Sequence, residues 1–290
     1  MDTLESLSSQ LETTEDIGAI VSTMKSLSSA SIRQYERAVE AMAYYRRTVA
    51  LGLQVVLREG APPRPWRAGS GRRGLIVIGS DRGLCGRFND RVADAARDRL
   101  NAADAPAFLF VLGIRAAARL ETAGHAPDRL FTLPGSVQGL ASTVQSVAVE
   151  VDRAMAAHGL ESFSVLFTER GMRGLGEAVE EPLVPIPDAY LHELATAPWP
   201  GPSLPICRMN REALFSWLIR QQLFVVLYRA LAESLAAEHA ARLAAMQRAE
   251  KNIDERRETL LGQYRQKRQE TITRELMDVV AGFESVRGRD

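Results

Sequence analysis

Proline is confined to the middle of this chain. All 13 prolines lie between Pro62 and Pro205, so the two flanks of the chain contain none. Proline lacks the backbone N–H and clashes with the preceding helical turn, at a cost of about 3 kcal/mol in a helix interior. The distribution therefore predicts two helical arms around a globular insert. We place the divisions at residues 1–61, 62–205 and 206–290.

The N-terminal arm carries the apolar spacing of a packed helix. Leu4, Leu7 and Leu11 lie three and four residues apart, and a second set with this spacing follows in a shifted phase. The second set is Ile17, Ile20, Met24 and Leu27. Such spacing lines one side of a helix with side chains that pack against a neighbour. We expect a helix from about Thr3 to Leu57.

The C-terminal arm predicts a second helix, from about Asn210 to Phe283. Its first part is apolar over a wide arc, whereas residues 237–275 carry charges of both signs and a single glycine. This helix is far longer than the typical one of about 11–12 residues, and its length indicates a coiled coil. Because the arms flank one compact insert, we expect them to pair antiparallel.

The middle of the chain alternates short apolar runs with segments of helical spacing. Strands are expected at 74–80, 107–113 and 163–169, with an edge strand at 177–187, and helices at 87–100, 114–124 and 137–159. This alternation predicts a small α/β domain, Rossmann-like, with a mostly parallel sheet. Residues 58–73 and 195–205 are rich in helix-breaking residues and are expected to be connectors. The expected fold class is α/β, with a long antiparallel coiled coil and this inserted domain.

The loop Gly79–Asn89, GSDRGLCGRFN, lies between an expected strand and an expected helix. Ligands of α/β sheets bind at such turns, because helix N-termini attract phosphate. The loop matches neither GxxxxGK[ST] nor GxGxxG. Three interpretations remain open: a nucleotide site, a tight turn whose glycines supply positive φ, and a loop shaped to meet another subunit.

The sequence shows no catalytic constellation. Cys85 has no histidine near it in the sequence, so a structural thiol is favoured over a nucleophile. Cys85 and Cys207 are far apart and are interpreted as free thiols. The histidines lack the spacing of metal ligands, and we expect His239 to lie on a helix surface or to bond between helices. No catalytic residue, cofactor or metal is expected.

Charge and hydropathy exclude two kinds of direct partner. The formal net charge is zero, so nothing in the composition favours nucleic acid. No segment offers the roughly 20 uninterrupted apolar residues that cross a bilayer. The sequence therefore predicts no nucleic-acid binding and no direct membrane insertion.

Three separated motifs resemble the gamma subunit of F-type ATP synthases. STMKSLSSASIR, residues 22–33, is similar to the N-terminal helix segment of that family. IGSDRGLCGRFN, residues 78–89, is similar to its signature loop after the first strand. AEHAARLAAMQRA (237–249) and RQETITREL (268–276), followed by VVAGFE, resemble its C-terminal signature. The resemblance covers the whole chain.

The resemblance implies a non-catalytic central-stalk rotor subunit. Its coiled coil would stand inside a hexamer of alpha and beta subunits, and its α/β domain would lie against the epsilon subunit and the membrane c-ring. Rotation would couple ion flow through the c-ring to the nucleotide affinity of each catalytic beta subunit, in ATP synthesis or hydrolysis. The complex would hold this chain peripherally at the cytoplasmic face of the bacterial inner membrane.

The resemblance also implies residues that contact other subunits. One set, facing the lever segments of the beta subunits, is Met24, Lys25, Asp81, Arg82 and Cys85. The second set is Arg268, Gln269 and Thr273, which would meet the catch loops of the beta subunits, together with Glu275, which is expected to contact another subunit.

The chain departs from the family pattern at two places. Arg248 stands where a small amide is usual, with a charge cluster after it, and the N-terminal motif ends in SSASIR instead of an AAKLR-like sequence. These departures resemble a divergent branch, the N-type bacterial ATPases, which pump sodium ions or protons by hydrolysis. Two other classes remain: a non-catalytic coiled-coil scaffold or assembly protein, and a small α/β enzyme with oligomerisation helices.

Overall fold

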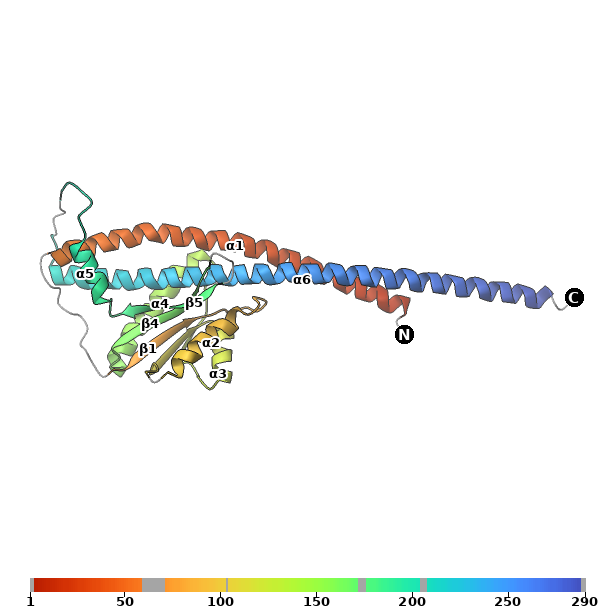
Figure 1. Cartoon of the computed structure of the whole chain (residues 1–290), viewed down its shortest axis with the longest axis horizontal. Coiled ribbons are helices and arrows are strands. Elements are labelled where there is room, and N and C mark those ends of the chain that lie inside the picture. Colours follow the sequence, from red (N-terminus) through yellow and green to blue (C-terminus); the bar gives the residue numbers. More distant parts are fainter. Residues whose placement is uncertain (1–2, 59–70, 103, 172–175, 204–207, 288–290) are drawn as a thin grey trace. The chain divides into compact units, whose positions relative to one another are not determined.

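A computed structural model describes residues 3–58, 71–102, 104–171, 176–203 and 208–287, with side chains through Ala281 (Figure 1). The chain forms two compact units. We call Ser28–Arg242 the α/β unit, and Met1–Leu27 with Leu243–Asp290 the paired-helix unit. Helices α1 (Leu4–Arg58) and α6 (Arg211–Arg287) contribute residues to both units, which are taken in turn. Both predicted helical arms are confirmed.

Within the described residues, the α/β unit is built on a five-stranded sheet in the order β3-β2-β1-β4-β5. The strands are β1 (Arg73–Ile78), β2 (Phe108–Leu112), β3 (Arg129–Phe131), β4 (Ser162–Glu169) and β5 (Glu177–Val184). The first four in the sheet order are parallel, and β5 pairs antiparallel with β4 at one edge. Ile76 lies between Phe110 and Val165 in the register. The mostly parallel, Rossmann-like sheet and its edge strand are confirmed.

Successive residues of each strand face opposite layers, as the pleat of a strand requires. Ile76 and Phe110 face α4 (Leu140–His158) and the buried sides of α1 and α6. Leu75 and Leu109 face α2 (Phe88–Leu100) and α3 (Ile114–Thr122). Figure 1 shows α2 and α3 on the side of the sheet away from α6. The central strands are buried on both faces, which explains their nearly continuous apolar sequences.

Two elements are absent from the sequence prediction. Strand β3 has only three residues and is largely exposed, so it has no apolar run to reveal it. Helix α5 (Asp188–Thr196) follows a proline and packs on the ends of α1 and α6 through Tyr190 and Leu191. A short 3-10 turn, η1 (Val137–Gly139), precedes α4. The connector predicted at 195–205 was wrong at its first two residues, because α5 extends to Thr196; residues 197–203 contain no helix or strand, as expected.

In the α/β unit, α1 and α6 run antiparallel. The Tyr45 hydroxyl donates to the Gln221 carboxamide oxygen at 2.6 Å, and the Tyr35 ring stacks on His239 with centroids 5.7 Å apart. Residue numbers that fall along α1 therefore rise along α6. This part of the predicted antiparallel pairing is confirmed.

In the paired-helix unit, α1 and α6 are again antiparallel. Lys25 Nζ lies 2.6 Å from Glu250 Oε1, and Arg257 Nε lies 3.2 Å from Glu15 Oε1. The inward positions recur every seven residues, which is the repeat of a coiled coil. They are Leu7, Thr14 and Val21 on α1, and Met246, Ile253 and Leu260 on α6.

Three of the four residues in the second apolar set of α1 do not pack against another helix, and the fourth, Met24, is half-buried. Ile17, Ile20 and Leu27 are 48%, 59% and 63% exposed. The packed side continues instead through Thr14 and Gly18, where apolar character is weak. Ile17 precedes Gly18 by one residue and so lies about 100° round the helix. The expectation was wrong at these three residues, because the seven-residue repeat rather than apolar identity decides which side faces α6.

Candidate functional site

The loop Gly79–Asn89 leaves the carboxyl end of β1 and leads into α2. Asp81 anchors it, since its Oδ1 accepts from the Ile114 amide at 2.9 Å and its Oδ2 accepts from the Leu133 amide at 2.8 Å. Both carboxylate oxygens thus hold the connections that follow β2 and β3. Asp81 is one of the residues expected to contact another subunit, but both of its carboxylate oxygens accept hydrogen bonds from within the α/β unit.

A second set of bonds closes the start of the loop. The Ser80 amide donates to Asn89 Oδ1 at 3.0 Å, and Asn89 Nδ2 donates to Ser80 Oγ at 2.7 Å. The Gly79 amide donates to the Leu112 carbonyl at 2.8 Å. A Cβ on Gly113, whose φ is 111°, would lie 2.7 Å from the Ser80 nitrogen. The amides of Gly79 and Ser80, where the loop leaves β1, are therefore engaged, which argues against a phosphate cradle at this point.

The tight-turn interpretation of the loop is confirmed. Gly86 has φ of 57°, in the region that glycine enters without steric cost. Leu84 also has positive φ, 62°, although it is not a glycine. The left-handed region costs a leucine about 1–2 kcal/mol, so the bonds around it must define the backbone.

Leu84 was missed as a candidate by sequence reasoning. Its side chain is 61% exposed, so the strained backbone holds a large apolar group out in solvent. Arg82, from the set implied by resemblance, is exposed in the same loop. The sequence signal that could have revealed it is a leucine that lies between Gly83 and Gly86, in RGLCG. Together the two side chains make this loop a projecting surface with apolar and basic character.

Cys85 is buried at 2% exposure, in a small cluster with Phe88 and Ala237. Its Sγ lies 3.4 Å from Asn89 Nδ2. Burial raises the pKa of the Cys85 thiol, which is therefore protonated and poorly nucleophilic near neutral pH. The structural-thiol interpretation is confirmed. Cys207 lies outside the described residues.

Helix α6 clamps the loop from the other side. The Arg242 guanidinium is buried at 5% exposure and donates from Nε and Nη2 to the Gly83 carbonyl, at 3.3 Å each. Its Nη2 also donates to the Glu238 carboxylate. Burial raises the pKa of Glu238, and the Arg242 charge opposes that rise. The pair is therefore an internal strut between α6 and the loop.

His239 lies beside this strut. Its ring stacks on Tyr35 of α1, and its Nδ1 lies 3.4 Å from Arg242 Nη1. Burial, followed by the positive charges of Arg242 and Arg82, lowers the pKa of His239 to about 4. The ring is neutral near pH 7. The expected hydrogen bond between helices is not found among the described residues, because the polar contact of His239 stays within α6 and its contact with α1 is ring stacking.

The α1 pair expected to contact a partner lies in the paired-helix unit. Met24 is half-buried. Lys25 Nζ donates to both carboxylate oxygens of Glu250, at 2.6 and 2.7 Å. Lys25 thus already has a partner on α6.

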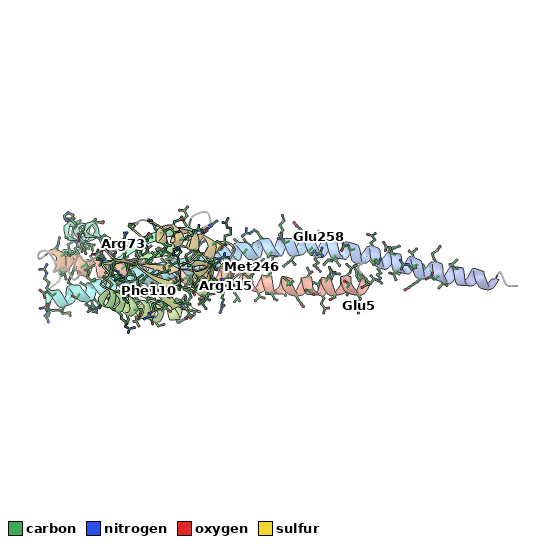
Figure 2. All side chains as sticks on the ribbon, turned by 90° about the horizontal axis from the view of Figure 1, so that it is seen from below. Glu5, Arg73, Phe110, Arg115, Met246 and Glu258 are labelled. Carbon is green, nitrogen blue, oxygen red and sulfur yellow. The ribbon has the colours of Figure 1, made fainter. Side chains whose placement is uncertain are left out.

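The remaining predicted residues lie further along α6. Arg268, Gln269, Thr273 and Glu275 are all exposed. In the part of the chain that the structure describes, none of their side chains has a hydrogen bond or ion pair. The structure does not bring this set together with Lys25, whose α6 partner is Glu250. Figure 2 shows other charged side chains, those of Glu5 and Glu258, pointing away from the helices.

The end of α6 exposes apolar side chains as well. Every residue from Ile272 to Ala281 is exposed. The large apolar side chains among them are Ile272, Leu276, Met277, Val279 and Val280, at 46–67% exposure. Contiguous exposed apolar residues on a helix are typical of a surface that interacts with another molecule.

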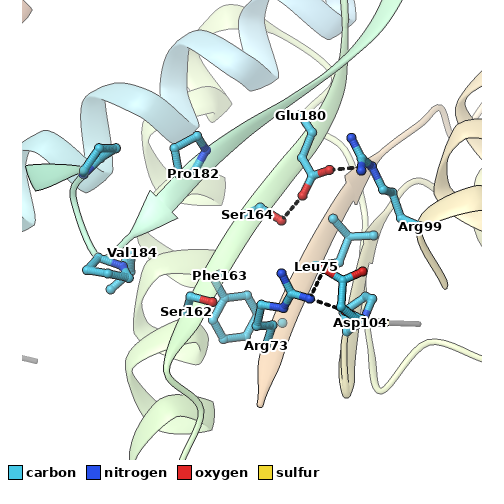
Figure 3. A pocket seen from close by; sticks show the side chains of 14 residues that line it. Arg73, Leu75, Arg99, Asp104, Ser162, Phe163, Ser164, Glu180, Pro182 and Val184 are labelled. Atoms are coloured by element: carbon cyan, nitrogen blue, oxygen red, sulfur yellow. Dashed lines mark hydrogen bonds and ion pairs between the residues drawn. The ribbon is translucent and has the colours of Figure 1, made fainter. Parts of the chain in front are cut away.

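A pocket of about 380 Å³ lies at the opposite, amino edge of β1 and β4 (Figure 3). Arg73 pairs with Asp104, and this contact lowers the pKa of the Asp104 carboxyl. Arg99 Nε lies 2.8 Å from Glu180 Oε2, and the Ser164 hydroxyl donates to Glu180 Oε1 at 2.6 Å. The charged groups that line this pocket therefore satisfy one another and leave none for a ligand.

Among the described residues, no group of three His, Cys, Asp or Glu side chains is placed to hold a metal ion. No helix among them has an apolar stretch long enough to cross a bilayer.

Comparisons with known proteins agree over nearly the whole chain. The family model described as ATP synthase matches residues 3–286. The ATP synthase gamma chain of Geotalea uraniireducens is 27% identical over 296 residues, which are 99% of this chain and 100% of that relative. The gamma chain of Granulibacter bethesdensis is 27% identical over 301 residues, with the same shares.

Solved structures show the same fold. A chain of the Euglena gracilis mitochondrial ATP synthase in rotational state 3 matches with a TM-score of 0.65 and 16% identity, over 98% of this chain and 94% of that one. The rotor of that enzyme in rotational state 1 matches with a TM-score of 0.60 and 16% identity, over 93% of this chain and 98% of that one. Fold and exposed surfaces define a protein of paired long helices with an α/β unit, built to contact others. The chain belongs to the ATP synthase gamma family.

Proposed function

We propose that this chain is the central-stalk rotor subunit of an F-type ATP synthase or ATPase. It is a non-catalytic subunit that couples ion flow through the c-ring to conformational change at the catalytic beta subunits, in rotary ATP synthesis or hydrolysis. The observation that carries this proposal is the exposed apolar end of α6, from Ile272 to Ala281, in a member of the gamma family. That surface requires a covering partner, and a ring of alpha and beta subunits supplies one.

The proposed partners are the alpha and beta subunits, the epsilon subunit and the membrane c-ring. The Euglena gracilis structure is described as containing F1 and a c-ring, and a Tetrahymena thermophila match as central stalk and c-ring. In this arrangement the chain lies peripherally at the cytoplasmic face of the bacterial inner membrane. The coupling ion, sodium or proton, is selected by other subunits.

The proposed contacts with the beta subunits use the two sets of residues named above. Arg82 is exposed and can meet an acidic segment directly. Asp81 and Cys85 act through the shape of the loop, because the carboxylate is bonded inside the unit and the thiol is buried. On α6, Arg268 and Gln269 have free polar groups, which favours a direct role.

The proposed functional parts are residues 1–61 and 206–290 as the coiled coil and residues 62–205 as the α/β domain. We also propose membership of the divergent N-type branch. Arg248 supports this assignment, since its side chain is exposed where the family usually has a small amide.

Co-expression with candidate alpha and beta subunits tests the rotor role. We expect a stable complex whose steady ATPase activity depends on this chain. Truncation after Leu260 removes the exposed end of α6 and should weaken that activity, whereas truncation after Ala281 keeps it and serves as the matched control. If the chain self-associates but binds neither alpha nor beta, the coiled-coil scaffold becomes the better assignment.

A further inference from the structure

A second pocket of the α/β unit lies between α1, α5, α6 and the end of β5. Its volume is about 600 Å³. Small-molecule sites in proteins typically have volumes of about 300–1,000 Å³. Glu181 of β5 and five polar side chains on three helices line this pocket. The five are Arg46 and Arg47 of α1, Tyr190 of α5, and Gln222 and Arg229 of α6.

The arginines of this pocket differ in whether an acidic side chain neutralises their charge. Arg229 pairs with Glu181 of β5, and its Nη1 lies 3.2 Å from Glu233 Oε1. Arg46 and Arg47 are exposed, and neither side chain has an ion pair or hydrogen bond with a described residue. The pocket of Figure 3, by contrast, has every lining charge paired. Two positive charges are thus left over at the second pocket.

Two uncharged polar groups at the pocket also lack partners. Gln222 is 7% exposed, and its Oε1 is a buried acceptor without a hydrogen bond in the described part of the chain. A buried acceptor left unpaired is costly, so it calls for a donor. The Tyr190 hydroxyl has no hydrogen bond to a described residue. Burial raises the pKa of this hydroxyl, which stays protonated and can donate.

We propose that this pocket binds a small phosphate monoester. Arg46, Arg47 and the Tyr190 hydroxyl hold its phosphate, and a hydroxyl of its organic part donates to Gln222. Guanidinium groups bind phosphate in bidentate geometry. A phosphate monoester near neutral pH carries close to two negative charges, which match the two uncompensated arginines better than a single carboxylate does. The volume leaves room for an organic group beside the phosphate.

The proposed ligand would join elements that are distant in sequence. It would bridge α1 through Arg46 and Arg47, α5 through Tyr190, and α6 through Gln222. A ligand that binds only the folded protein raises its thermal stability by an amount that grows with the logarithm of ligand concentration above the Kd. Binding should therefore be visible both as heat and as a higher unfolding temperature.

The test is isothermal titration and thermal unfolding of the full chain with defined probes. These are glycerol 3-phosphate, inorganic phosphate, glycerol, hexaglutamate, and phosphatidylcholine vesicles with or without phosphatidic acid. We expect saturable binding of glycerol 3-phosphate, tighter than that of inorganic phosphate, and no binding of glycerol. Omitting the alpha and beta subunits avoids their own phosphate sites and makes the result independent of the rotor assignment.

Variants locate the binding. The double variant Arg46→Ala/Arg47→Ala should weaken glycerol 3-phosphate binding by about tenfold or more. The control Arg33→Ala/Arg37→Ala removes the same two charges from exposed positions of α1 outside the pocket and should leave affinity unchanged. Gln222→Met should remove the preference for glycerol 3-phosphate over inorganic phosphate while keeping the binding of both.

Several results would overturn the proposal. These are the absence of saturable binding by either phosphate probe, and equal losses in the two double variants. Binding to phosphatidic acid vesicles alone would reject a small-molecule ligand and assign the same phosphate chemistry to a lipid headgroup. Binding of hexaglutamate without glycerol 3-phosphate binding would reject phosphate in favour of an acidic segment of a partner protein.

Discussion

The buried guanidinium of Arg242 donates twice to the carbonyl oxygen of Gly83, so helix α6 fixes the backbone just before Leu84. Glu238, one turn earlier on α6, balances the charge of Arg242. The relationship links the C-terminal helix to the loop of the α/β unit through one side chain. It explains how an exposed leucine can be held at positive φ.

Replacing Arg242 by Met should be strongly destabilising. The change leaves Glu238 buried without its partner, and breaking a buried pair in this way costs about 3–5 kcal/mol. Urea unfolding of the full chain measures the loss. The double variant Glu238→Gln/Arg242→Met removes both charges and should recover a large part of it. A single variant as stable as wild type would show that the pair is not a strut.

His239 should make stability depend on pH in the mildly acidic range. The pKa of His239 is lowered from 6.5 to about 4 by burial and nearby arginines. Between these values the unfolded chain binds more protons than the folded one, so stability rises with pH through this window and is lost as pH falls. From pH 7.5 to pH 5 the loss is about 2 kcal/mol.

The variant His239→Phe isolates this effect, because it keeps a ring to stack on Tyr35 and cannot titrate. Glu238 has a raised pKa and acts in the opposite sense, since its contribution to stability falls as pH rises. That contribution is common to both proteins and cancels in their difference. Urea unfolding at both pH values should show the larger acid loss in wild type. Equal losses would place the histidine in solvent.

Leu84→Gly should separate stability from function. Glycine enters the left-handed region freely, and the leucine side chain is 61% exposed, so stability should stay the same or rise by up to about 1 kcal/mol. The ATPase activity of the assembled complex should nevertheless fall. Leu130→Ala removes a similarly exposed leucine from β3 and is the control. Full activity of the glycine variant would deny Leu84 a role at a subunit contact.

Leu260→Ala and Ile20→Ala test which side of the helices packs. Leu260 is 1% exposed at an inward position of α6, and its truncation should cost about 2–4 kcal/mol. Ile20 is 59% exposed, and its truncation should change stability by less than about 0.5 kcal/mol. Thermal unfolding of the two variants compares them directly. Similar losses would contradict the seven-residue repeat described here.

Local sequence patterns predict most of this fold. The absence of proline predicted α1 and α6, apolar runs predicted β1, β2 and β4, and β5 lies where an edge strand was expected. Strand β3 escaped because three residues make no pattern, and α5 escaped because prolines surround it. The orientation of Ile17 and Ile20 could not be inferred from apolar identity, because only the partner helix decides which side is covered.

The candidate site was predictable only in part. The motif GSDRGLCGRFN drew attention to the right loop, through resemblance. Its geometry depends on contacts such as Asp81 with Leu133 and Gly83 with Arg242, which join residues far apart in the chain. No local spacing reveals such pairs. The positive φ of Leu84 follows from those distant bonds, so it too was beyond the reach of the sequence.

The exposed apolar segment of α6 from Ile272 to Ala281 also affects the lifetime of the chain in a cell. An orphan copy displays these side chains to chaperones and proteases, and to other orphan copies with which it can aggregate. Its steady abundance is then set by the supply of the subunits that cover it. The exposed apolar end of α6 therefore makes it necessary that this subunit and the subunits of the ring are synthesised in matching amounts.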